Sequence, residues 1–178
     1  GASLDYAASR GEYLNARIMA EYLGFPFIDA EQLIFFSGTS CDFKKTEELT
    51  KFVLSSVEYA VIPGFYGVNE KGEVVTFSRG GSDVTGSLVA AAVYADLYEN
   101  WTDVSGFLVS DPRIVDKPEV IDYITYRELR ELSYMGAGVL HEDAIFPVRK
   151  EGIPIQIKNT NVPEDHGTMI VANTLKKP

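Results

Sequence analysis

The sequence has little cysteine, fewer basic than acidic residues, and no long apolar run. Its 178 residues include a single cysteine, Cys41, which excludes an internal disulfide and a cysteine-cluster zinc site. Its 16 lysines and arginines against 26 aspartates and glutamates give a net charge of −10, whereas nucleic-acid binding needs a basic face. No apolar run approaches the roughly 18 residues of a membrane span, and the first residues lack the basic and apolar regions of a signal peptide. We therefore expect a soluble, cytoplasmic protein without nucleic-acid or membrane partners.

The residues that are present have the composition of a globular protein, with 46% apolar and 24% charged side chains. A chain of this length makes one domain or part of one. Capping boxes at Ser9 with Glu12 and at Thr125 with Glu128 mark helix starts. We predict a helix from Ser9 to the stop signal Gly24 and further helices over 46–57, 84–97, 126–134 and 141–150. Pro147 could break the last of these. We predict strands over 60–65, 73–77, 98–104, 154–158 and 168–171. Strands that alternate with helices predict an α/β sheet with helices on its faces.

The strongest physical signal for a binding site is the run Arg-Gly-Gly-Ser-Asp at 79–83, between a predicted strand and a predicted helix. Gly80 and Gly81 allow close approach of the backbone to a ligand at a helix N-terminus, and Arg79 can hold a carboxylate or phosphate through two hydrogen bonds. Ser82 adds a hydroxyl, and Asp83 could bind an amine or a metal-bound water. A plain glycine turn, with Ser82 or Asp83 capping the next helix, is the alternative that the residues leave open. The phosphate-binding loop of common NTPases and the dinucleotide glycine pattern are both absent.

A second set of polar residues follows the strand predicted over 98–104. Thr102 and Asp103 lie near its end, where Asp103 could accept hydrogen bonds from an amine or a ribose hydroxyl. Arg113 could neutralise phosphate charge, although the spacing alone favours a turn with a surface ion pair at 111–113. Glu12 completes a capping box by default, but a carboxylate near a helix start could also bind a substrate ammonium group.

The runs that carry a family resemblance are Gly11 with Glu12 and residues 61–65, 79–83, 101–104, 111–115, 131–134, 139–141, 153–160 and 167–168. In this order they resemble the catalytic domain of the aspartokinases, within the amino-acid-kinase family, over about residues 9–171. The run at 79–83 is specific to aspartokinases, whereas the Thr-Asp-Val and Asp-Pro-Arg runs are shared more widely in that family.

The resemblance implies a three-layer αβα sandwich of the amino-acid-kinase type. It also implies phosphoryl transfer from Mg²⁺-ATP to the β-carboxylate of L-aspartate, at the start of lysine, threonine and methionine biosynthesis. By matching position, Arg79 would bind a carboxylate of aspartate and Asp83 would organise the site near the phosphoryl group, as the two catalytic candidates. The other candidates are Glu12, Gly80, Gly81 and Ser82 for the substrate and Thr102, Asp103 and Arg113 for ATP, with no metal ligand assigned and a homodimer as one state open to the parent protein.

The chain departs from the family pattern at its start. The family's catalytic domain begins with a Lys-Phe-Gly-Gly-Thr strand and loop whose lysine helps neutralise the transferred phosphate, and this sequence has no such stretch. We therefore expect residues 1–8 to be non-native or a disordered lead-in, residues 9–172 to be a partial catalytic domain without the regulatory ACT domains, and residues 173–178 to be a tail. A frequent family lysine is Gly138 here. We expect little or no kinase activity from the isolated chain.

Two other functions stay open from the sequence. One is another amino-acid kinase, acting on glutamate, N-acetylglutamate or UMP; these relatives share the Asp-Pro-Arg type of segment but not the run at 79–83. The other is a catalytically silent nucleotide-binding or regulatory module that keeps the fold.

Overall fold

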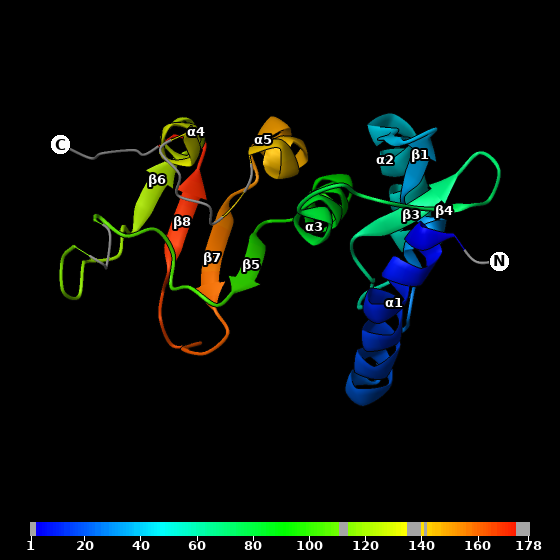
Figure 1. The fold of residues 1–178 in the computed structure, drawn as a ribbon, viewed down its shortest axis with the longest axis horizontal. Helices are drawn as coiled ribbons and strands as arrows, with labels where there is room; N and C mark the ends of the chain where they lie inside the picture. Colours follow the sequence, from blue (N-terminus) through cyan, green and yellow to red (C-terminus); the bar gives the residue numbers. More distant parts are fainter. Residues whose placement is uncertain (1–2, 111–113, 135–139, 141, 174–178) are drawn as a thin grey trace. The chain divides into compact units, whose positions relative to one another are not determined.

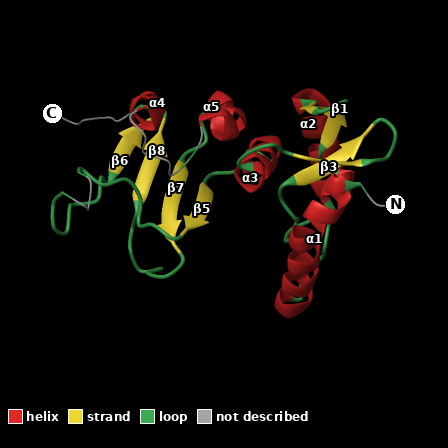
Figure 2. Ribbon diagram, in the orientation of Figure 1, coloured by secondary structure: helices red, strands yellow, loops and turns green. Residues whose placement is uncertain are grey.

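The computed structural model describes residues 3–110, 114–134, 140 and 142–173, and the chain forms two compact units, Gly1–Val93 and Tyr94–Pro178 (Figure 1). Each unit has its own four-stranded sheet and its own helices (Figure 2). The predicted α/β fold class is therefore confirmed, with the strands divided between two sheets. No helix in the described part of the chain is both long and apolar enough to cross a bilayer.

The first unit begins with helix α1, Leu4–Leu23, which runs beside strand β4 (Figure 1). Its N-cap is Ser3, whose Oγ accepts a hydrogen bond from the backbone N–H of Tyr6, and it ends at Gly24 in the left-handed conformation with φ 69°. The predicted stop at Gly24 is confirmed, but the predicted start at Ser9 is wrong. Ser9 lies buried inside the helix and donates its hydroxyl hydrogen to the Tyr6 carbonyl. Residues 4–8, expected to be a disordered or non-native lead-in, are helical.

The sheet of the first unit has the strand order β2-β1-β3-β4, with β2 at Ser40–Cys41, β1 at Phe35–Ser37, β3 at Tyr66–Asn69 and β4 at Val74–Thr76. Strands β1 and β3 are parallel, and the other two pairs are antiparallel. The short 3-10 helix η1 spans Ala30–Gln32 and lies against β3. The core of this unit is formed by fully buried side chains, among them Leu33, Ile34, Phe36 and Tyr66.

Helices α2, Phe43–Leu54, and α3, Gly81–Ala92, pack against each other in this unit. Helix α2 starts three residues before the prediction because the side chain of Asp42, as N-cap, accepts a hydrogen bond from the Lys45 backbone N–H. Helix α3 also starts three residues early and ends before the predicted 97. The strand predicted over 60–65 is wrong: only Val61 forms an isolated bridge, with Phe27, and β3 begins at Tyr66.

The second unit has the strand order β5-β7-β8-β6, with β5 at Tyr98–Thr102, β7 at Ile155–Asn159, β8 at Thr168–Val171 and β6 at Tyr123–Thr125 (Figure 2). Strand β5 is parallel to β7, β6 is parallel to β8, and β7 is antiparallel to β8. Alternate side chains of β7 are buried, which explains the apolar residues Ile155 and Ile157.

The helices of the second unit are α4, Tyr126–Tyr134, the 3-10 helix η2, Glu142–Ile145, and α5, Phe146–Glu151. The capping box before α4 is confirmed: the Thr125 N–H donates to the Glu128 carboxylate, and the Glu128 N–H donates to Thr125 Oγ1. The single helix predicted over 141–150 is wrong: residues 142–145 form η2, and α5 begins only at Phe146, with Pro147 in its first turn, where proline is tolerated. His141, the predicted start of this helix, lies outside the described residues.

Candidate active site

The run at 79–83 joins β4 to α3 through a tight turn. Gly80 is the N-cap of α3 and adopts the left-handed conformation, with φ 52° and ψ 31°, which explains the need for glycine there. Since the N-cap has no side chain, α3 starts without a side-chain cap hydrogen bond. The N-cap residue is therefore Gly80 and not Ser82 or Asp83, and the positive end of the helix dipole lies at this loop.

The side chains of this loop differ in exposure. Arg79 and Ser82 are exposed, Asp83 is half-buried, and Gly81 is buried. Asp83 takes part in an interaction within the protein. The loop thus presents a guanidinium and a hydroxyl to solvent at a helix start, an arrangement that suits a carboxylate or phosphate group.

A second loop, residues 63–65, packs directly on the start of α3. A Cβ placed on Gly64 would come within 2.9 Å of the Ser82 Cα, and one on Gly81 within 2.8 Å of the Phe65 Cα. Phe65 itself has φ 80°, a left-handed conformation that a phenylalanine rarely adopts. Sequence reasoning missed this loop because it predicted a strand over 60–65, although the adjacent Pro63 and Gly64 are a turn signal.

Glu12 lies in the middle of α1 with its side chain exposed. The start of α1 is tied to the strand before the Arg79 loop, because Thr76 Oγ1 donates a hydrogen bond of 3.0 Å to the Asp5 carboxylate. Within the described residues, however, no hydrogen bond or ion pair joins Glu12 to the loop at 79–83. The structure therefore places Glu12 in the same unit as the loop, and among the described residues no polar interaction links the two.

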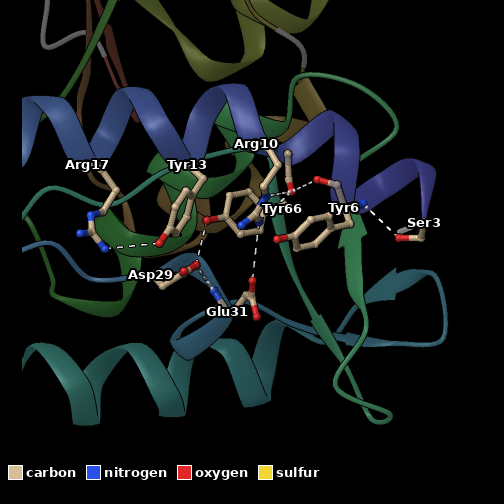
Figure 3. Close-up of polar contacts among 9 residues, drawn as sticks. Ser3, Tyr6, Arg10, Tyr13, Arg17, Asp29, Glu31 and Tyr66 are labelled. Atoms are coloured by element: carbon tan, nitrogen blue, oxygen red, sulfur yellow. Dashed lines mark hydrogen bonds and ion pairs between the residues drawn. The ribbon is translucent and has the colours of Figure 1, made fainter. Parts of the chain in front are cut away.

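A cluster around Arg10 fixes the orientation of α1 (Figure 3). The Arg10 guanidinium lies over the rings of Tyr6 and Tyr13, at 4.3 and 4.5 Å from their centroids. Both tyrosines belong to α1 itself. Outside the helix, the guanidinium lies 5.4 Å from the Tyr66 ring centroid and forms an ion pair of 3.7 Å with Glu31. Since residues two apart point to different sides of a helix, this anchoring turns Glu12 away from the cluster and toward solvent.

The same cluster reaches the core through Tyr66, whose hydroxyl donates a hydrogen bond of 2.8 Å to the Asp29 carboxylate (Figure 3). Burial raises the pKa of the Tyr66 hydroxyl well above its usual range, and the hydrogen bond to Asp29 raises it further. Burial and the nearby Asp29 charge raise the pKa of Glu31, against the opposing effect of Arg10. The hydrogen bond between Tyr66 and Asp29 and the ion pair between Arg10 and Glu31 hold these groups together, so the cluster stabilises the position of α1 and β3.

An open groove of about 810 Å³ lies in the first unit, between the start of α1 and the β3–β4 turn. Its lining is residues 3, 5, 6, 31, 38, 39 and 69–75. None of the site residues predicted from the sequence belongs to this lining, so we place the candidate site at the loop before α3 and not in the groove.

In the second unit, Thr102 ends β5 at the edge of the sheet where β7 also ends, because the two strands are parallel and Thr102 pairs with Asn159. Thr102 Oγ1 donates a hydrogen bond of 3.3 Å to Asp103, whose side chain is exposed. The Thr102 carbonyl accepts hydrogen bonds from both the N–H and the hydroxyl of Thr160. The predicted pair Thr102 and Asp103 is therefore brought together at this edge, whereas Arg113 lies outside the described residues.

A hydrogen-bond network holds the loop that follows Asp103. Ser105 Oγ donates to the Asp165 carboxylate at 2.7 Å and accepts from Asn159 Nδ2 at 2.9 Å. Lys158 Nζ donates to the backbone carbonyls of Pro163 and Asp165. Sequence reasoning assigned no role to these side chains. The position of Asn159 at the end of a strand next to Thr102 was the available signal, but the pairing of β5 with β7 was needed to use it.

The chain matches the model of the amino acid kinase family over residues 2–159. It belongs to the amino acid kinase family. Among the curated relatives of this amino-acid-kinase chain, Aspartokinase 3 of Bacillus subtilis is 39% identical over 95% of the chain and 39% of the relative. The aspartokinase of Rickettsia prowazekii is 34% identical over 96% of the chain and 40% of the relative.

Solved structures agree with these sequence relatives. The aspartate kinase of Clostridium acetobutylicum is 64% identical, with a TM-score of 0.94 over 99% of this chain and 41% of that one. Aspartokinase III of Escherichia coli in complex with aspartate and ADP is 29% identical, with a TM-score of 0.86 over 97% of this chain and 41% of that one. The fold class expected from the resemblance is thus confirmed as that of the amino-acid kinases. The chain spans about two fifths of the length of these relatives.

Proposed function

We propose that the protein containing this chain is an aspartokinase, which transfers the γ-phosphoryl group of ATP to the β-carboxylate of L-aspartate. The observation that carries the proposal is the exposed Arg79 on the Arg-Gly-Gly-Ser-Asp turn, at a helix start without a side-chain cap. The 64% identity to an aspartate kinase structure and the aspartokinase names of the sequence relatives support it. Cytoplasmic location and a step toward lysine, threonine and methionine belong to the same proposal.

The residues that would bind the phosphoryl acceptor, aspartate, belong to the first unit. Arg79 would hold a carboxylate of aspartate through two charge-assisted hydrogen bonds, and Gly80 and Gly81 would let the backbone approach it. Ser82 would donate a further hydrogen bond. Glu12 would hold the substrate ammonium group, and Asp83 would organise the site near the phosphoryl group.

The residues that would bind the nucleotide belong to the second unit. Thr102, Asp103 and Arg113 would contact ATP, which brings Mg²⁺ with it as Mg²⁺-ATP. An oxygen of the aspartate β-carboxylate attacks the γ-phosphorus, the bond from that phosphorus to the bridging oxygen breaks, and ADP leaves. Since the attacking carboxylate is already ionised, no strong base is needed, and positioning and charge neutralisation supply most of the catalysis.

The test is an acceptor comparison in the full-length protein, measuring ADP release with aspartate, glutamate, N-acetylglutamate and UMP. We expect aspartate to be the preferred acceptor. Arg79→Ala should lower kcat/KM for aspartate about 10- to 100-fold, the effect of losing hydrogen bonds to a charged group, and Arg79→Lys should retain part of the activity. Arg127→Ala, at an exposed arginine on α4, is the matched control and should leave the activity unchanged.

Preference for another acceptor would replace aspartokinase by a different amino-acid kinase. Binding of ATP without phosphoryl transfer to any of the four acceptors would favour the silent nucleotide-binding module. Either result contradicts the proposal.

A further inference from the structure

Thr85 connects the two loops of the acceptor side. It lies one turn into α3, and its side chain is almost completely buried, with 3% of its surface exposed. Its Oγ1 donates a hydrogen bond of 2.8 Å to the Gly81 carbonyl, and the same oxygen accepts one of 3.2 Å from the backbone N–H of Phe65. The first bond is common for threonine inside a helix, where the hydroxyl bonds to the preceding turn. The second is different, because it ties the helix to a loop twenty residues earlier in the chain.

The backbone of Phe65 is held on both sides. Its N–H is bonded to Thr85, and its carbonyl accepts a hydrogen bond of 2.9 Å from the N–H of Phe77, two residues before Arg79. Phe65 therefore bridges the segment that enters the Arg79 turn and the helix that leaves it. Its φ of 80° is unfavourable for a phenylalanine, and such a conformation persists only where the surroundings enforce it.

The packing leaves no room for the two loops to move independently. The Gly64 and Gly81 positions are so close to Ser82 and Phe65 that even a methyl group would approach backbone atoms within 2.9 Å. A displacement of residues 64–65 must therefore displace Gly81 and Ser82, and with them the turn that carries Arg79.

We propose that Thr85 is a positioning residue for the acceptor site: its hydroxyl locks the loop at 64–65 onto the start of α3 and so fixes the turn at 79–82 in the geometry that receives the acceptor carboxylate. This inference rests on the proposed aspartokinase function. Thr85 itself is buried and acts on the substrate only through the two loops.

The test compares Thr85→Val, which keeps the shape and removes the hydroxyl, with Thr85→Ser, which keeps the hydroxyl, in the full-length protein. We expect Thr85→Val to raise KM for aspartate about 10-fold, with KM for ATP unchanged, as for the loss of one buried hydrogen bond. Thr85→Ser should restore KM for aspartate to within about 2-fold of the wild-type value. Thr50→Val is the matched control, since Thr50 is also a buried helical threonine and its Oγ1 has no hydrogen-bond partner among the described residues.

Equal rises in both KM values, or a loss in Thr85→Val that Thr85→Ser does not rescue, would overturn the proposal. If Thr85→Val does not fold, Gly64→Ala pushes the same loop against Ser82 and should produce the same selective rise in KM for aspartate; an unchanged KM would count against the proposal.

Amide hydrogen exchange separates this inference from the proposed function. Even if the wild-type protein does not phosphorylate aspartate, Thr85→Val should accelerate exchange at the N–H groups of Phe65 and residues 79–82 relative to Thr50→Val. Unchanged exchange at these positions would refute the positioning role by itself.

Discussion

Glu31 forms an ion pair with Arg10 although its surroundings disfavour the ionised form of its carboxyl group. Its carboxylate lies 3.7 Å from the Arg10 guanidinium, but burial and the Asp29 charge outweigh that attraction and raise its pKa above 4.5. The pair is partly exposed to solvent, and such pairs contribute little to stability. The cluster therefore orients α1 mainly through ring contacts that leave the helix: Arg10 lies 5.4 Å from the Tyr66 ring centroid, and Tyr13 packs edge-on against Phe27.

A pH dependence follows from this raised pKa. A group that binds its proton more tightly in the folded state stabilises the fold at low pH, and this contribution is lost as the pH rises. We expect the free energy of unfolding of the wild-type chain, relative to Glu31→Gln, to decline as the pH rises from 4.5 through the raised pKa and then to level off. Urea unfolding at a series of pH values measures this difference.

Glu48→Gln, at an exposed position on α2, provides the correction for removing one negative charge. A wild-type stability that instead increases relative to Glu31→Gln over this range would show that Arg10 dominates the environment of Glu31.

At the scale of elements, the sequence predicted the α-helices and the strands β4, β5, β7 and β8. It missed β1, β2, β3 and β6 and misplaced several helix starts. Strand β8 and helix α4 were predicted at their observed bounds, and the capping box of Thr125 with Glu128 marks the start of α4. The start of α1 was misplaced because Ser9 with Glu12 has capping-box spacing, whereas Ser3 caps the helix through the Tyr6 N–H alone. Local spacing could not reveal that Ser9 is buried inside the helix, because that burial depends on the tertiary structure.

The loop at 63–65 was missed for a different reason, although Pro63 and Gly64 are a local turn signal. Its apolar residues resemble a strand, but the loop conformation is set by contacts with α3, twenty residues later in the chain. The start of α3 was misplaced for a local reason: the helix begins directly after the glycine N-cap, ahead of the apolar residues used for the prediction.

Two helical glycines should respond in opposite ways to alanine. Gly11 lies exposed in the middle of α1, and a methyl group added there would have nothing within 4 Å, whereas a methyl group on Gly81 would meet the Phe65 backbone at 2.8 Å. We expect Gly11→Ala to raise the free energy of unfolding by about 0.5–1 kcal/mol through helix propensity. Gly81→Ala should lower it by about 1–3 kcal/mol through overpacking.

Urea unfolding of the two variants beside the wild-type chain measures both effects. Changes of the same sign in the two variants would mean that the close contact between the start of α3 and the loop at 63–65 does not limit stability.

At the scale of the whole molecule, the proposed chemistry is divided between two compact units. The residues assigned to aspartate lie in Gly1–Val93, and those assigned to ATP lie in Tyr94–Pro178. The position of the Arg79 run between a strand and a helix could be read from the sequence. The supporting residues Thr85, Asn159 and Asp165 could not, because their roles depend on hydrogen bonds between segments 20 to 60 residues apart.

The measurement that tests this division most directly is calorimetric titration of the full-length protein with each ligand, using Mg²⁺-ATP alone and aspartate in the presence of ADP. We expect Arg79→Ala to weaken aspartate binding at least about 10-fold without changing ATP binding, and Asp103→Ala to weaken ATP binding by a similar factor without changing aspartate binding. Asp116→Ala, at an exposed site in the second unit, should change neither. If both variants weaken the same ligand, or if neither weakens any, the proposed assignment of the two units is contradicted.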